Sequence, residues 1–210
     1  MKLHIGNNGT KRGWRRVEVE NTLLLVTGTS FTLNFLIYIQ NIYLNQNQTD
    51  EEIRFPYSST EIAFKEDFPK QYEQLWKAIA EKVKLDNSYI YELSNEDKKL
   101  FYDRLLEGKS EAPECFNQIY KSFQAWWNSL AGSFSLERSI DSSTIGKLYE
   151  DLSNLLKERG KTPQNSLYIS LIYDKCLLAN SPSSPSFAVL AIEEFFIRYR
   201  ELVPKLEKSF

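Results

Sequence analysis

SEAPECFNQIYKSFQAWWNSLAG, residues 110–132, is the stretch of this sequence that decides the fold most clearly. Apolar side chains recur in it at steps of three and four residues, namely Phe116, Ile119, Tyr120, Phe123, Trp127 and Leu130. At about 100° per residue they share one stripe of a helix, with Trp126 at the edge of the stripe. Because so large an aromatic face must be covered, we expect this helix to form the centre of a helical core.

The same stretch carries signals for both ends of the helix. Ser110 can accept a hydrogen bond from an unpaired N–H of the first turn, and Pro113 is tolerated near the start because it needs no such partner. Gly132 can adopt the left-handed conformation that often ends a helix. The sequence therefore predicts one helix with a polar face in water.

Residues 1–64, N-terminal to this helix, show apolar side chains with a period of two and turns rich in glycine and asparagine. This pattern predicts strands at residues 3–5, 17–20, 23–27 and 31–39, with shorter ones at 53–55 and 61–64. Gly28 can start a hairpin loop between two of them. We expect an antiparallel meander with one face on the core.

After Lys65 the apolar period becomes that of a helix. Besides the central helix, the spacing predicts helices at residues 67–83, 94–108, 141–160, 162–179 and 187–206. The sequence SPSSPS at residues 181–186 is typical of a loop. The expected fold class is α+β, with a sheet portion at 1–66 and a helical portion at 67–210 that can pack as a single domain.

Composition limits the classes of partner and compartment. The chain has 210 residues and a formal net charge of -2, so the whole molecule has no strong preference for nucleic acid or anionic membranes. Cys115 and Cys176 lack the spacing of a disulfide framework or a zinc site, and no secretory signal opens the chain, so we expect a cytoplasmic protein. The charge-free residues 21–49 contain several amides, which favour strands over a membrane helix.

Few residues are suited to catalysis. His4 is the only histidine, and the sequence contains no phosphate-binding loop, dinucleotide fingerprint or nucleophile elbow. We therefore predict no enzyme activity, no metal site and no cofactor. The alternative is a Mg²⁺-dependent nuclease that uses carboxylates, for which the sequence offers Glu18, Glu20 and the group Asp50, Glu51 and Glu52. A strand whose acidic face lies in water is the ordinary explanation of Glu18 and Glu20.

One basic segment is suited to binding nucleic acid. Lys11, Arg12, Arg15 and Arg16 surround Trp14, so cations for phosphate lie beside a ring for base stacking. We predict that these five residues contact RNA or DNA. The alternative is a solvated hairpin loop whose tryptophan packs under the sheet.

The aromatic surplus of the helical half predicts a protein interface. Trp126, Phe196 and Tyr199 are the residues expected at it, because aromatic side chains concentrate binding energy at interfaces. The predicted function is that of a non-catalytic binding protein or accessory subunit that docks on a larger assembly, which can contain nucleic acid. An inhibitor or immunity-type protein that covers a partner enzyme is the alternative within the binding class.

Overall fold

The computed structural model describes residues 23–47, 53–58, 60–85, 92–108, 110–161, 166–180, 183–184 and 186–210. Along the chain the elements are β1 (Leu25–Thr29), α1 (Phe31–Asn47), α2 (Phe68–Leu85), α3 (Asn95–Leu105), α4 (Ala112–Trp127), α5 (Ser133–Ser139), α6 (Ser142–Glu158), β2 (Leu167–Ile172), β3 (Ser183–Ser184), β4 (Phe187–Ala191), α7 (Ile192–Phe196) and α8 (Tyr199–Glu207).

The sheet is parallel, so the expected antiparallel meander is wrong. Its strand order is β1-β2-β4-β3, and β1, β2 and β4 all run in the same direction. Only the two-residue strand β3 is antiparallel to its neighbour β4. An antiparallel hairpin needs a second strand directly after a short turn, but β1 is followed by helix α1. The neighbour of β1 is therefore β2, which comes from the C-terminal part of the chain and runs parallel to it.

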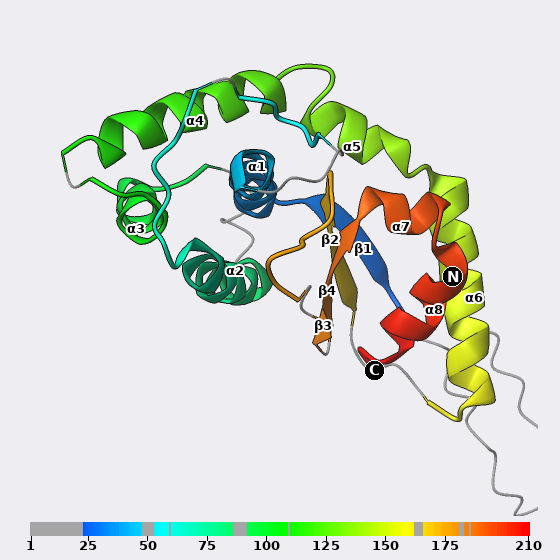
Figure 1. Ribbon diagram of the computed structural model, residues 1–210. Helices are drawn as coiled ribbons and strands as arrows, with labels where there is room; N and C mark the ends of the chain where they lie inside the picture. Colours follow the sequence, from blue (N-terminus) through cyan, green and yellow to red (C-terminus); the bar gives the residue numbers. More distant parts are fainter. Residues whose placement is uncertain are drawn as a thin grey trace, which may run out of the picture.

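Helices cover both faces of this sheet (Figure 1). On one face, α1 packs against β2, and α2 to α4 belong to the same apolar cluster as Ile172 and Val189 of the sheet. On the other face, α6, α7 and α8 pack with alternate residues of the same strands, such as Ile169 and Leu190. A strand buried on both faces is apolar along its whole length and shows no alternation of apolar and polar residues.

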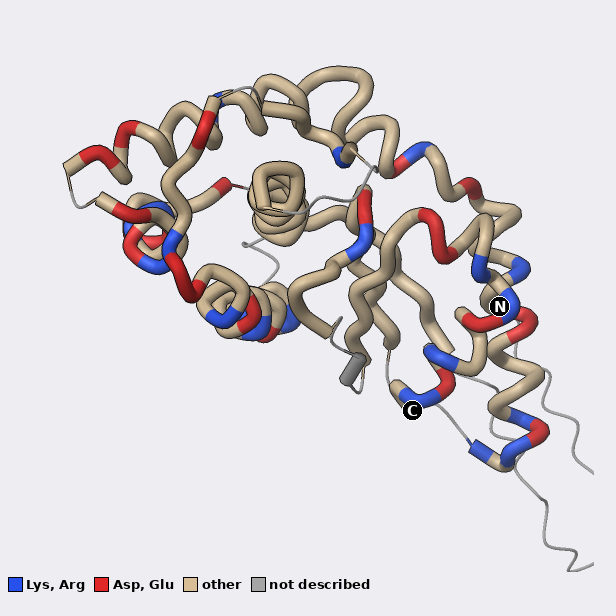
Figure 2. The backbone as a smooth tube through the Cα atoms, viewed as in Figure 1, with Lys and Arg blue, Asp and Glu red and all other residues tan. Residues whose placement is uncertain are grey.

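Helix α1 occupies the position where the sequence predicted a strand at residues 31–39, and that prediction is wrong. Almost every side chain from Phe31 to Leu44 is buried, because α2, α3, α4 and the sheet surround the helix. Figure 2 shows no charge on α1, whereas the outer helices carry many. A helix that is buried on all sides has no polar face, so its apolar residues do not recur at the 3.6-residue spacing by which a helix is recognised. Among the described helices, none is both long and apolar enough to cross a bilayer.

The C-terminal predictions fail for a related reason. Residues 162–179 were expected to be a helix and contain β2, while residues 187–206 contain β4, α7 and α8. Buried parallel strands are short apolar runs, which cannot be distinguished from buried helix by period alone. The strands expected at 53–55 and 61–64 are absent from the described residues there, and Phe64 forms a single bridge to Leu106.

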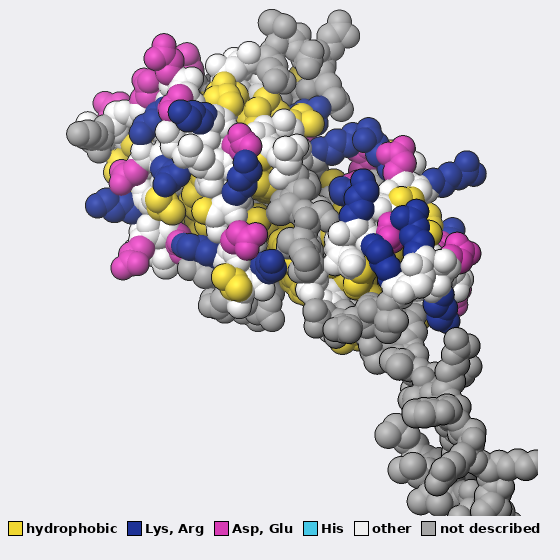
Figure 3. Space-filling model, turned by 90° about the horizontal axis from the view of Figure 1, so that it is seen from below, with side chains coloured by type: hydrophobic (Ala, Val, Ile, Leu, Met, Phe, Trp, Pro, Cys, Tyr) yellow, Lys and Arg dark blue, Asp and Glu magenta, His cyan; other side chains and the backbone are white. Residues whose placement is uncertain are grey.

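The helices with one solvated face were predicted correctly. They are α2, α3, α4 and α6, each of which lies within or close to its expected range. The proposed division after residue 66 stays a prediction, although β1 and β2 come from opposite sides of it and are paired. Charged side chains of both signs are interspersed over the face in Figure 3.

The ends of α4 differ from the prediction. Ser110 does not cap it, since Glu111 takes that position without a side-chain hydrogen bond. Gly132 precedes α5 with φ -89°, so it is not left-handed, whereas Gly108 and Gly160 have φ of 77° and 65°. The caps expected near Ser94 and Asp141 are confirmed, because each side chain accepts a backbone N–H of the first turn.

Asp97 gives this helical part a pH dependence. Its carboxylate accepts the Ser94 hydroxyl at 2.7 Å and pairs with the Lys82 ammonium at 3.0 Å. Burial raises its pKa, but the Ser94 and Lys82 interactions outweigh burial and leave the pKa below its ordinary value. The folded state therefore binds this proton more weakly than the unfolded state, so the stabilisation is present above about pH 4 and is lost as pH falls through the folded pKa.

We expect Asp97→Asn to lower the free energy of unfolding by about 1–2 kcal/mol at pH 7 and to flatten the decline of stability below about pH 5. Urea titrations over a pH series measure both effects. Asp103→Asn, at an exposed position of the same helix, is the matched control and should change little. An equal loss at pH 7 and pH 3 for Asp97→Asn would contradict the assignment.

Candidate functional site

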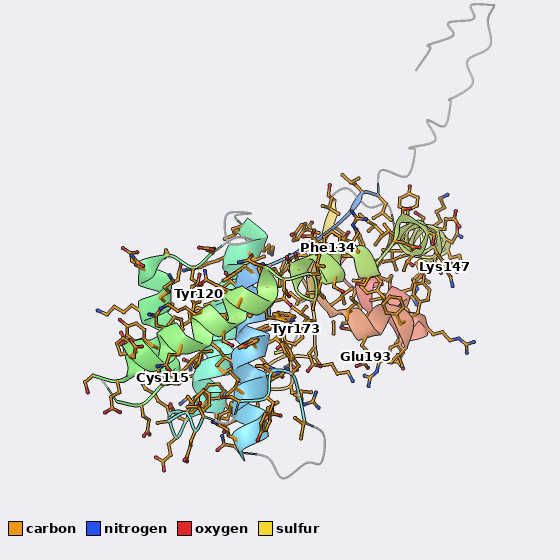
Figure 4. The ribbon with its side chains drawn as sticks, turned by 90° about the horizontal axis from the view of Figure 1, so that it is seen from above. Cys115, Tyr120, Phe134, Lys147, Tyr173 and Glu193 are labelled. Carbon is orange, nitrogen blue, oxygen red and sulfur yellow. The ribbon has the colours of Figure 1, made fainter. Side chains whose placement is uncertain are left out.

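The carboxyl ends of the parallel strands meet at one edge of the sheet. Figure 4 views the molecule from this side, where Tyr173, just after β2, lies between α4 and α7, and Glu193 lies on α7. The chain leaves β2 toward the α1 face and leaves β4 toward the opposite face. Open α/β sheets bind their ligands outside the carboxyl ends of the strands, at such divergences. This edge is therefore the first place to look for a site.

Buried amides of α1 hold the chain that follows β2. The Asn34 side chain donates to the Leu171 carbonyl and accepts from the Tyr173 N–H, both at 2.9 Å. The Gln40 side chain donates to the Lys175 carbonyl at 2.8 Å and accepts from the Leu177 N–H at 2.7 Å. Two fully buried side chains of α1 thus supply hydrogen-bond partners to the backbone of this loop.

The same helix holds a second loop, residues 53–58. Asn45 accepts the Arg54 N–H at 2.9 Å and donates to the Arg54 carbonyl at 2.7 Å. Asn41 donates to the Phe55 carbonyl at 2.8 Å and to the Asp174 carboxylate at 2.9 Å. Asn41 therefore links the loop 53–58 to the loop after β2, which lies far away in sequence.

Four rings from these elements form what we call the aromatic cluster, namely Tyr38, Phe55, Trp126 and Tyr173. The Trp126 ring centroid lies 4.9 Å from that of Tyr173 and 5.1 Å from that of Phe55. Tyr38 contacts Phe55 and Trp126 at 5.9 and 6.2 Å. Phe55 remains 47% exposed and the neighbouring Tyr57 70% exposed, so the cluster reaches the surface.

Half-buried charges border the aromatic cluster. Arg54 lies 3.5 Å from the Asp174 carboxylate, and Lys175 pairs with Glu193 at 2.7 Å. Burial, followed by the nearby Asp174 carboxylate, holds the pKa of the Tyr173 phenol well above its ordinary value. The phenol therefore stays protonated and donates to the Phe55 carbonyl at 3.0 Å.

A pocket of about 210 Å³ opens beside the cluster, between α1, α4 and the loop 53–58. Ile42, Ile62 and Ile119 line it, and the hydroxyls of Tyr38 and Ser122 meet 2.8 Å apart at its wall. None of the described side chains lining the pocket is charged. Burial also raises the pKa of the Cys115 thiol, which lines the pocket, so this group is a weak nucleophile. The pocket is suited to a neutral, partly apolar group.

The three residues expected at a protein interface lie in two places. Trp126 belongs to the aromatic cluster on the α1 side of the sheet, whereas Tyr199 packs on the opposite side, with its hydroxyl 2.8 Å from the Asp151 carboxylate. Phe196, at the end of α7, is 59% exposed. The structure therefore does not join Trp126 and Tyr199 in one surface.

Other predicted site residues lie outside the described part of the chain. They are the basic group Lys11, Arg12, Trp14, Arg15 and Arg16, the carboxylates Glu18, Glu20, Asp50, Glu51 and Glu52, and His4. Within the residues that are described, no group of three or more His, Cys, Asp or Glu side chains could hold a metal ion.

Sequence reasoning missed Tyr38, Phe55, Tyr57 and Tyr173. A usable signal existed, because Asn34, Asn41 and Asn45 fall on one side of a helix, and a row of amides along an otherwise apolar segment predicts loops bound to it. The predicted strand at residues 31–39 included Asn34 but ended before Asn41 and Asn45, so the row was not recognised. Comparison of the chain with protein-family models, curated proteins and solved structures finds no match.

Proposed function

We propose that this protein is a non-catalytic binding protein that docks a partner protein on the aromatic cluster and the adjoining pocket. The observation that carries the proposal is the exposure of Phe55 and Tyr57 directly beside a neutral pocket. Protein interfaces combine an aromatic centre with a charged rim, which the pairs Arg54–Asp174 and Lys175–Glu193 would supply here. The occupant of the pocket is an apolar or aromatic side chain of the partner.

Physical chemistry favours that occupant. A charged group would lose its hydration in a pocket whose described walls offer no countercharge, whereas an apolar group gains about 25 cal/mol for each Å² buried. Interface binding energy concentrates where one side chain fills a pocket and neighbouring rings exclude water. Tyr38 and Tyr57 line the pocket, and Phe55 and Trp126 lie next to Tyr38, so these rings would exclude water from around an inserted side chain.

A photo-crosslinking amino acid at position 57 tests the proposal in cells that make the protein naturally. We expect a discrete adduct with one partner from position 57 and none from position 77, where exposed Lys77 lies on α2. Ser122→Phe places a ring in the pocket and should reduce the adduct at least about tenfold, as the loss of one anchor side chain does. Lys121→Phe, at the adjacent exposed position of α4, is the matched control and should leave the adduct unchanged.

Two results would contradict the proposal. One is crosslinking of equal yield from positions 57 and 77, which indicates random encounters. The other is an adduct that Ser122→Phe and Lys121→Phe affect alike, which means that the pocket is not used.

The identity of the adduct separates the two forms of binding protein. A partner that is itself a subunit of a stable complex supports an accessory subunit, whereas an enzyme that loses activity when the purified protein is added supports an inhibitor. An RNA or DNA contact by residues 11–16 remains part of the accessory-subunit proposal, since those residues lie outside the described part of the chain.

A further inference from the structure

Strand β1 forms one edge of the sheet. In the parallel pair, the Leu167 N–H donates to the Leu24 carbonyl at 2.8 Å, which shows that the backbone of residue 24 faces β2. Backbone direction alternates along a strand, so Val26 also faces β2, while Leu25 and Thr27 direct their N–H and C=O groups outward. Within the described ranges, no strand pairs with this outer side of β1.

This edge lacks the features that protect edge strands from pairing. Residues 23–29 contain no charge and no proline, and the β1–β2 register runs without a bulge. Leu24 is 55% exposed and Val26 39% exposed, so apolar side chains accompany the outward N–H and C=O groups of Leu25 and Thr27. Natural edge strands are protected by lysine, proline or bulges because an open edge is a template for another strand.

We infer that β1 pairs antiparallel with β1 of a second copy of this chain, with the two-fold axis at Val26. Leu25 then lies opposite Thr27 of the second copy, and each of these two pairs exchanges two N–H···O=C bonds. The four bonds use only the outward groups of Leu25 and Thr27, so the pairing with β2 is untouched. The two sheets join into one.

The sequence of the strand favours a second copy as the occupant. A two-fold interface places the same patch against itself, and like charges at its centre would repel. Residues 23–29 carry no charged side chain, so no such repulsion arises. At the axis, Val26 meets its own copy as a non-hydrogen-bonded pair, the geometry in which side chains approach most closely. Leu24 lies diagonal to this pair and adds apolar area.

Sedimentation velocity of the purified full chain over a concentration series tests the inference. The unmodified protein should dimerise, and Thr27→Pro should weaken the dimer about tenfold or more, because it removes one outward N–H from each copy. Proline at this position leaves the β1–β2 bonds in place, as it does at natural sheet edges. Thr27→Val keeps the N–H and should dimerise like the unmodified protein.

A charge exchange gives a second readout that does not depend on proline. Val26→Lys and Val26→Glu should each be monomeric alone, since like charges would meet at the axis, and a mixture of the two should form a heterodimer. Circular dichroism confirms that each variant is folded. A chain that is monomeric at all concentrations, a dimer that Thr27→Pro leaves unchanged, or a lysine–glutamate mixture that stays monomeric would overturn the inference. The first of these results would leave the edge to a different occupant.

Discussion

Asn34→Leu will lower the free energy of unfolding by about 3–5 kcal/mol, because it leaves two buried backbone groups without partners. Asn34 is fully buried, and its amide joins the Leu171 carbonyl to the Tyr173 N–H at the end of β2. Leucine has the same branching and the same number of heavy atoms, so no cavity forms and the main loss comes from the unpaired polar groups. Urea denaturation followed by circular dichroism measures it.

The matched control is Asn47→Leu. Asn47 lies at the exposed end of the same helix, where its side chain bonds the Tyr43 carbonyl in contact with water. Water can replace that bond, so we expect a change of no more than about 0.5 kcal/mol. If the two variants lose similar amounts of stability, the amides of α1 are not what holds the loop after β2.

Phe35→Ala is expected to cost about 3–5 kcal/mol, the usual range for a phenylalanine removed from a core. Its ring has no exposed surface and lies 5.1–5.8 Å, centroid to centroid, from four other rings. These rings are Phe101, Phe116, Tyr120 and Phe123. They come from α3 and α4, so the cavity would open at the centre of the α1-side core.

Phe134→Ala is the control for the phenylalanine prediction. Phe134 lies on α5 and is half exposed, with Arg138 over its ring, so its loss should cost less than about 1 kcal/mol. Thermal unfolding ranks the two variants directly. Equal shifts of the midpoint would mean that the ring cluster around Phe35 is looser than its geometry implies.

The candidate site could be predicted only in small part. Trp126 was identified from its place at the edge of the stripe on residues 110–132, and it does belong to the aromatic cluster. Phe55 and Tyr173 lie in loops whose positions depend on hydrogen bonds to Asn41 and to each other across the chain. A local sequence pattern does not show contacts between residues that are distant in the sequence. The site could therefore be identified only from the tertiary structure.

The sequence by itself determined the helices that have one face in water. In α2, α4 and α6 the polar face makes the period of 3.6 residues visible. The side chains of Ser94 and Asp141 mark the starts of α3 and α6, because each accepts a backbone N–H of the first turn. These features depend on residues within one or two turns of each other. They can therefore be recognised without knowing the rest of the molecule.

Only the tertiary structure decided that residues 31–47 are a helix and that residues 167–172 and 187–191 are parallel strands. Nearly every residue of 31–44 and of the two strands is buried, so their sequences show no contrast between an inner and an outer face. Their conformation depends on neighbours supplied by distant parts of the chain, which accept or donate the hydrogen bonds of α1's amides and complete the sheet. The apolar period of a segment appears in its sequence only when one face is in water. Where water is excluded from all faces, packing against distant segments determines whether the segment is a helix or a strand.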